Sequence, residues 1–123
     1  MLPSAVQIAE ENGVNILAFV RDERGAADQD RVRFFFAHEL LKTTASWQRM
    51  VIDLSGVITL DSASLGPLVQ KLREIQDLKG SLALTGVSSP ALREIFSLTR
   101  FDKVFAIHAN RAEAISAVSA SPA

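Results

Sequence analysis

The segment V-I-D-L-S-G-V-I-T-L-D-S-A-S-L-G, residues Val51–Gly66, decides the fold of this chain. An apolar run from Met50 to Leu54 is followed by turn residues, and an amphipathic pattern begins directly after Asp61 and Ser62. This order predicts a buried strand, a loop, and a helix whose first turn carries an exposed hydroxyl. Because a hydroxyl in that place can be modified without unfolding the chain, the segment favours signalling over catalysis.

The helix predicted after this loop runs from Ser62 to Lys79. Pro67 is tolerated because it is predicted to fall within about the first turn, and Gly80 is predicted at the position after the helix end. The stripe that follows the i, i+3, i+4, i+7 rule comprises Leu65, Leu68, Val69, Leu72, Ile75 and Gln76, of which only Gln76 is polar. The opposite, exposed face is predicted to comprise Gln70, Lys71, Arg73, Glu74 and Asp77.

The rest of the chain alternates between strands and helices after an opening hairpin. The expected strands are Ala5–Ala9, Val14–Val20, Met50–Leu54, Ser81–Gly86 and Lys103–Ile107. The other expected helices are Asp30 to about Ser46 with Asp28 or Asp30 as cap, a short one capped by Ser89, and a last one capped by Asn110. The order β-β-α-β-α-β-α-β-α predicts an α/β fold: one domain over 1–118 with a mixed sheet, parallel in its later part, and a frayed tail at 119–123.

Composition excludes several classes of protein. With 13 basic and 14 acidic residues the net charge is −1, which argues against a nucleic-acid surface. No apolar run approaches the ~18–20 residues that span a bilayer, so no direct membrane insertion is expected. The first ten residues lack the profile of a signal peptide and the chain has no cysteine, so the predicted location is cytoplasmic.

The same census weighs against an enzyme. The two histidines, His38 and His108, lie far apart and are predicted to be structural or solvated. The chain has no tyrosine and none of the common phosphate-loop, zinc or nucleophile-elbow patterns. We therefore expect no catalytic residue, no cofactor and no metal. Asp53, at the end of a buried strand, is predicted to accept hydrogen bonds from nearby backbone.

Asp61 and Ser62 have two compatible interpretations. Either residue can cap the helix, which is worth about 1 kcal/mol. A phosphate on Ser62 would also be accepted by the partial positive charge of the helix start, because several amides there lack partners. Such a switch would act on binding and leave folding intact.

The segment Val51–Gly66 resembles the signature of STAS domains, the family of anti-sigma factor antagonists and their relatives, in which D-L-S-x-V at a strand end leads to D-S-S-G-L-G and a helix. Residues 80–108, G-S-L-A-L-T-G-V-S-S-P-A-L-R-E-I-F-S-L-T-R-F-D-K-V-F-A-I-H, resemble the family's second half. The likeness covers roughly Arg49 to Val118. It implies a non-enzymatic module of bacterial partner switching, which binds an anti-sigma factor that is also a serine kinase, is released by phosphorylation, and is restored by a phosphatase.

Carried over by position, the resemblance assigns phosphorylation to Ser62. It assigns partner binding to Asp61, Ala63, Ser64, Leu65, Gly66 and Pro67. Ala63 replaces the motif's second serine and Ser64 its first glycine, so Ser64 adds a side chain where a partner could approach closely and offers a second acceptor. Upstream, Arg21–Gly25 has no match to the family's G-x-[LI]-D segment. The alternatives are a structural STAS subunit of a stress-signalling scaffold or transporter-associated complex without a phospho-switch, and a nucleotide binder.

The run Phe34-Phe35-Phe36 cannot face one core on a helix. At 100° per residue Phe36 falls with the apolar stripe, whereas Phe34 falls near Leu41 on the other side. Either a loop or the N-terminus covers this second stripe, or Phe34 and Leu41 form a surface for a partner or for self-association as a homodimer. In the second case Phe34→Glu should change the mass measured by light scattering; an unchanged mass with the fold intact would exclude it.

Overall fold

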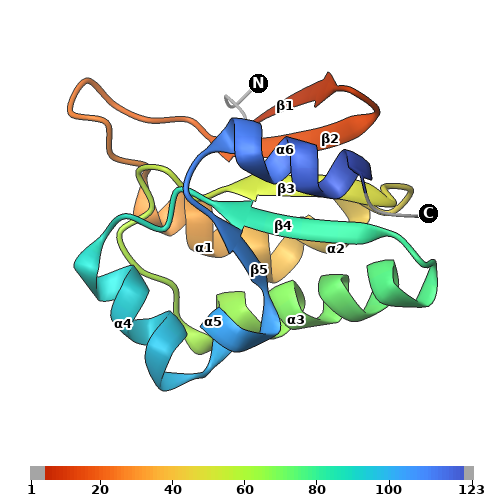
Figure 1. Cartoon of the computed structure of the whole chain (residues 1–123). Coiled ribbons are helices and arrows are strands. Elements are labelled where there is room, and N and C mark those ends of the chain that lie inside the picture. The colour runs from red at the N-terminus through yellow and green to blue at the C-terminus, as the bar shows by residue number, and fades with distance from the viewer. Residues whose placement is uncertain (1–4, 121–123) are drawn as a thin grey trace.

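The computed structural model describes residues 5–120, and Figure 1 shows the arrangement of its helices and strands. The elements, in chain order, are β1 (Val6–Glu11), β2 (Val14–Phe19), α1 (Gln29–His38), α2 (Leu40–Thr43), β3 (Arg49–Asp53), α3 (Ser62–Asp77), β4 (Ser81–Thr85), α4 (Pro90–Leu98), α5 (Phe101–Val104), β5 (Ala106–His108) and α6 (Arg111–Ala120). With α1–α2 and α4–α5 each counted as one helical segment, this is the predicted order, and the predicted α/β class is confirmed.

The five strands form one mixed sheet in the order β1-β2-β3-β4-β5. β1 runs antiparallel to β2, and the remaining neighbours are parallel, as predicted. The hairpin turns at Asn12 and Gly13, whose φ values of 55° and 76° belong to the two-residue turn that matches strand twist. This turn sets Glu11 opposite Val14 and so fixes the register of β1 on β2.

Helices cover both faces of the sheet (Figure 1). Met50, Ile52 and Leu54 point to the larger core, which the helices from α1 to α4 close. Val51 points to the other face, where Ala114, Ile115 and Val118 of α6 complete a smaller core. Because β3 is buried on both sides, its sequence shows no polar alternation, which is why an unbroken apolar run predicted it.

The long helix α3 follows most of its predicted stripe, although Gln76, which was predicted on that stripe, is exposed. Leu65, Leu68, Leu72 and Ile75 are buried. Lys71, predicted on the exposed face, is fully buried and its ammonium group donates to the Thr44 carbonyl at the end of α2. Since α2 packs against this side of α3, the exposed-face prediction for Lys71 was wrong.

The end of α3 also differs from its prediction. Lys79, with φ 59°, takes the left-handed position after the helix, and its amide donates to Gln76 while the Gly80 amide donates to Ile75. This is a Schellman ending displaced by one residue from the expected one. Gly80 is needed for another reason: a Cβ there would collide with the Gln48 carbonyl.

Three further boundaries differ from the sequence expectation. The predicted helix from Asp30 to Ser46 is broken at Glu39, and its cap is Asp28. Residues 103–104, predicted in a strand, end the short helix α5 instead. The last helix continues to Ala120, into the segment predicted as a tail, while 121–123 lie outside the described residues.

Candidate functional site

The loop between β3 and α3 lies at the edge of the sheet where the parallel strands end. Its middle is tied to two neighbouring elements. The Gln29 side-chain amide donates to the Thr59 carbonyl and accepts from the Ile58 amide, both at 3.0 Å. The Ser89 hydroxyl donates to the Ile58 carbonyl at 2.7 Å. Residues at the starts of α1 and α4 therefore fix the position of the loop that precedes Ser62.

Asp61 is the N-cap of α3 and the centre of a small polar cluster. Its Oδ1 accepts from both the amide and the hydroxyl of Ser64 at 3.1 Å. Its Oδ2 lies 3.2 Å from Nε of Arg33, which comes from α1. Because both charged side chains are about half exposed, we expect the ion pair to contribute at most about 0.5 kcal/mol. The cap is the stronger restraint.

Ser62 and Ser64 occupy opposite environments. Ser62, the first residue of α3, is exposed, and its hydroxyl takes part in none of the hydrogen bonds found among residues 5–120. Ser64 is 1% exposed, and its hydroxyl is directed at Asp61. Ser64 is thus part of the cap, whereas the Ser62 hydroxyl is open to solvent.

The remaining predicted partner-binding residues divide in the same way. Ala63 and Gly66 are exposed, Pro67 is half-buried, and Leu65 packs into the core. Pro67 is the sixth residue of α3, in its second turn and not its first as predicted. Since proline has no amide proton, the Ala63 carbonyl lacks its usual helical donor and remains an acceptor on the exposed side.

Two shallow hollows lie along consecutive parts of this loop. One of about 90 Å³ lies against α1 and is lined by Gln29, Val32, Arg33, Thr59, Leu60, Asp61 and Ser64. The other, of about 220 Å³, is lined by Arg24, Gly25, Ala26, Gly56, Val57, Ile58, Ser88 and Ser89. The Ile58 side chain is 48% exposed. Both hollows therefore lie along the loop that precedes Ser62, and Ile58 adds an exposed apolar side chain to the second one.

Sequence reasoning missed Gln29, Arg33, Ile58 and Ser89. Gln29 and Arg33 are four residues apart and therefore share one face of α1. This spacing marks a polar helix face, but no local pattern places the Ile58–Asp61 loop against it. Their contacts join residues about thirty positions apart in the chain.

Asp53 stabilises the start of the loop. Its Oδ1 accepts from the amide and hydroxyl of Ser55 at 2.9 and 2.6 Å. The amide bond confirms the prediction that Asp53 accepts from nearby backbone. Its Oδ2 accepts from Nε and Nη2 of Arg111 at 3.1 and 2.8 Å. Burial alone would raise the pKa of Asp53, but the bonds from Ser55 and Arg111 outweigh it and hold that pKa below its ordinary value. The carboxylate thus joins β3 to the start of α6.

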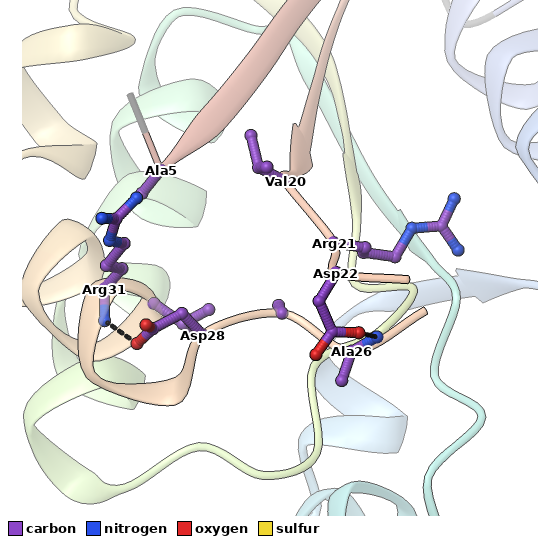
Figure 2. A pocket seen from close by; sticks show the side chains of 9 residues that line it. Ala5, Val20, Arg21, Asp22, Ala26, Asp28 and Arg31 are labelled. Carbon is purple, nitrogen blue, oxygen red and sulfur yellow. Dashed lines mark hydrogen bonds between the residues drawn. The ribbon is translucent and has the colours of Figure 1, made fainter. Parts of the chain in front are cut away.

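A larger hollow of about 280 Å³ lies between the end of β2 and the start of α1 (Figure 2). Its two carboxylates already serve the backbone: Asp28 caps α1 through the Arg31 amide, and Asp22 accepts from the Ala26 amide. The Arg21 guanidinium points away from the hollow in Figure 2. The carboxylates that line this hollow therefore stabilise the local backbone, and they do not point together into the hollow as ligand groups would.

The predicted self-association pair is only partly open to solvent. Phe34 is 56% exposed, and its ring lies 4.8 Å from the ring of His38. Leu41, beyond the break at Glu39, is half-buried. Phe34 therefore carries most of the apolar surface of that pair.

Residues 5–120 contain neither a group of side chains suited to a metal ion nor a membrane-spanning helix. In this part of the chain, no three acidic or histidine side chains are grouped so that they could hold a metal ion. Nor does any helix within these residues have the length and apolarity to cross a membrane.

Comparison with known proteins identifies the fold and the family. The family model described as "STAS domain" matches residues 13–114, and so extends well into the N-terminal third where the sequence motifs had no match. An anti-sigma-factor antagonist (STAS) domain protein from Planctomyces limnophilus is 24% identical, with a TM-score of 0.68 over 94% of this chain and 98% of that one. An anti-sigma factor antagonist from Mycobacterium paratuberculosis is 23% identical, with a TM-score of 0.66 over 92% of each chain.

A third solved structure is the Bacillus cell fate determinant SpoIIAA in its phosphorylated form. It is 19% identical, with a TM-score of 0.61 over 93% of this chain and 99% of that one. At these identities the solved structures establish the shared fold, while the family model covers most of the chain. The chain belongs to the STAS domain family.

Proposed function

We propose that this protein is a regulatory binding module of the anti-sigma factor antagonist type, without catalytic residues of its own. It binds an anti-sigma factor that is also a serine kinase, and phosphorylation of Ser62 by that kinase releases the complex. One observation carries the proposal: Ser62 is exposed at the first residue of α3, while Asp61 and Ser64 hold the helix start without it. Two similar structures add support, since one is an anti-sigma factor antagonist and the other is a phosphorylated protein of this fold.

The physical effect of the phosphate differs between this chain and its partner. A phosphoryl group adds about −1.5 to −2 charges at neutral pH. The start of α3 accepts that charge because the helix macrodipole places partial positive charge there. The Arg33 guanidinium also lies nearby, beside Asp61. A partner docked on the same surface meets new charge and bulk at its centre. The fold is therefore retained while the complex is lost.

The proposed contact surface follows from exposure. Asp61, Ala63 and Gly66 present accessible groups around Ser62, and Pro67 adds a half-buried edge. Ser64 and Leu65 contribute by holding the helix start in place, since their side chains are buried. A phosphatase would restore binding by removing the charge. We place this cycle in the cytoplasm, where a kinase of this kind meets ATP.

The direct test uses two serines of opposite burial. The protein is used to isolate its partner by pull-down, the captured kinase is incubated with it and ATP, and intact mass spectrometry follows. We expect one phosphoryl group on the wild type and on Ser64→Ala, and none on Ser62→Ala. Binding of the kinase should be lost on modification.

Two results would contradict this assignment. Phosphate that never appears, or that appears equally on Ser62→Ala, rules out Ser62 as the switch. Capture of a large signalling assembly or a transporter subunit in place of a kinase would favour the structural-subunit alternative.

A further inference from the structure

β1 is an edge strand of the sheet. It pairs with β2 on one side, and the other side has no strand among residues 5–120. Residues 7–11 are all exposed, and the Ile8 side chain is 52% exposed although it lies on the same face as buried Leu17. Figure 1 shows the strand at the rim, with β2 between it and the rest of the sheet.

The usual protections of an edge are weak in this strand. Natural edges are blunted by proline, lysine, bulges or covering segments. β1 reads V-Q-I-A-E-E and pairs with β2 through six consecutive residues without a bulge. Its charges, Glu10 and Glu11, are confined to one end.

The hairpin register decides which backbone groups face outward. The Val20 amide donates to the Ala5 carbonyl at 3.0 Å, so these two residues form a bonded pair. Bonded and unbonded pairs alternate along an antiparallel ladder. Ile8, three positions from Ala5, is therefore in an unbonded pair with Leu17, and its amide and carbonyl point to the open edge.

We propose that two copies of this chain associate through antiparallel pairing of their β1 strands, centred on Ile8. A two-fold axis through that position sets Ile8 opposite Ile8 of the second copy, where each amide meets the other carbonyl. Directly opposed residues share a face of the sheet, so the two exposed isoleucine side chains pack together.

The distribution of charge favours the antiparallel orientation for the pairing of two copies. Antiparallel pairing sets the acidic end, Glu10 and Glu11, against the uncharged start of the other strand. Parallel pairing would place like charges directly opposite, which is destabilising. The contact is smaller than a standard interface, so the dimer is weak and forms as concentration rises. This dimer uses a surface different from the Phe34–Leu41 surface and does not depend on the Ser62 switch.

The test begins with sedimentation velocity of the full chain between about 10 µM and about 1 mM, the range for an association of this strength. We expect the mass to rise from 13.4 kDa toward twice that value. Ile8→Pro removes the outward amide without removing a bond to β2, because proline is tolerated where the amide faces solvent. Both it and Ile8→Lys, which keeps the amide but adds charge, should remain monomeric with an unchanged circular dichroism spectrum.

The absence of cysteine provides a geometric control. Ile8→Cys should be joined across the dimer by a short bis-maleimide, since directly opposed Cβ atoms lie about 5 Å apart. Phe34→Cys, at a side chain of similar exposure, should not. A wild type that stays at 13.4 kDa throughout overturns the proposal. So does a dimer that persists in both Ile8→Pro and Ile8→Lys, or that crosslinks through Phe34→Cys and not through Ile8→Cys.

Discussion

Replacement of Asp61 by alanine removes the cap of α3 while leaving the Ser62 hydroxyl in place. In the wild type, one carboxylate oxygen accepts from the amide and the hydroxyl of Ser64, and the other contacts Arg33. Asp61→Asn is the matched control, because asparagine caps a helix about as well as aspartate but carries no charge. The pair of variants separates the cap from the ion pair.

The expected loss can be worked from these contacts. The cap is worth about 1 kcal/mol. The Ser64 hydroxyl, 1% exposed, loses its acceptor at a cost of about 1 kcal/mol. The half-exposed ion pair adds at most about 0.5 kcal/mol. We therefore expect Asp61→Ala to lower the free energy of unfolding by about 2 kcal/mol and Tm by about 6–10 °C. Asp61→Asn should lose less than about 0.5 kcal/mol.

Thermal and urea unfolding, followed by circular dichroism, measure both variants. Equal losses in Asp61→Ala and Asp61→Asn would refute the capping argument, because the charge would then be the contribution that matters. A loss below about 0.5 kcal/mol in Asp61→Ala would refute it as well. Since Asp61→Asn is expected to keep the fold, a large fall in its affinity for the kinase partner would show that the partner contacts the charged carboxylate directly.

Three further outcomes are expected elsewhere in the fold. Gly80→Ala should destabilise the protein strongly in urea unfolding, because its Cβ would collide with a backbone carbonyl; a change below about 0.5 kcal/mol would contradict this. The lowered pKa of Asp53 stabilises the fold above the ordinary aspartate range, and this stability is lost as pH falls through the lowered pKa. Arg111→Gln should move the midpoint of acid unfolding to higher pH. An unmoved midpoint would show that the Asp53–Arg111 ion pair does not contribute to stability in acid. Burial lowers the pKa of Lys71 in the folded protein. Lys71 of the unfolded chain therefore keeps its proton to higher pH, and stability should rise with pH between the lowered pKa and the ordinary lysine range. Lys71→Met should remove that rise in pH-dependent unfolding, and a rise that persists would exclude Lys71 as its source.

The strand–loop–helix segment could be predicted because its determinants are local. The run Met50–Leu54 has the composition of a strand buried on both faces, and α3 shows the helical period from Leu65 to Ile75. Asp61 and Ser62 stand where a cap and an exposed first residue belong. These features depend on neighbours within a few positions, which the sequence displays directly.

The helix α3 also marks where local reasoning ends. The helical period of its apolar residues predicted a buried stripe centred on Leu65, Leu68 and Leu72, and it predicted Lys71 on the exposed face. Ser64 and Lys71, seven positions apart, share one side of the helix and are both buried there. α1 and α2 pack against α3 and widen the buried face toward them. A helical pattern cannot show which flank a neighbouring helix will cover.

The short helix α5 is a second case. Phe101 and Phe105, four residues apart, fit a helical turn as well as they fit the end of a strand. The Phe96 ring lies 6.2 Å from that of Phe101, and the Phe101 and Phe105 rings are 5.6 Å apart. Packing against α4 selects the helix, so β5 begins later than predicted.

The sequence by itself determined the α/β order, the family resemblance, and an exposed Ser62 at a helix start, because each follows from residue types at short spacing. Only the tertiary structure decided that Ser64 is buried in the cap and that Arg33 and Gln29 stand beside the loop. These decisions depend on segments about thirty residues apart meeting at one edge of the sheet. Such meetings are set by how the helices pack on the sheet, and no local period encodes that packing.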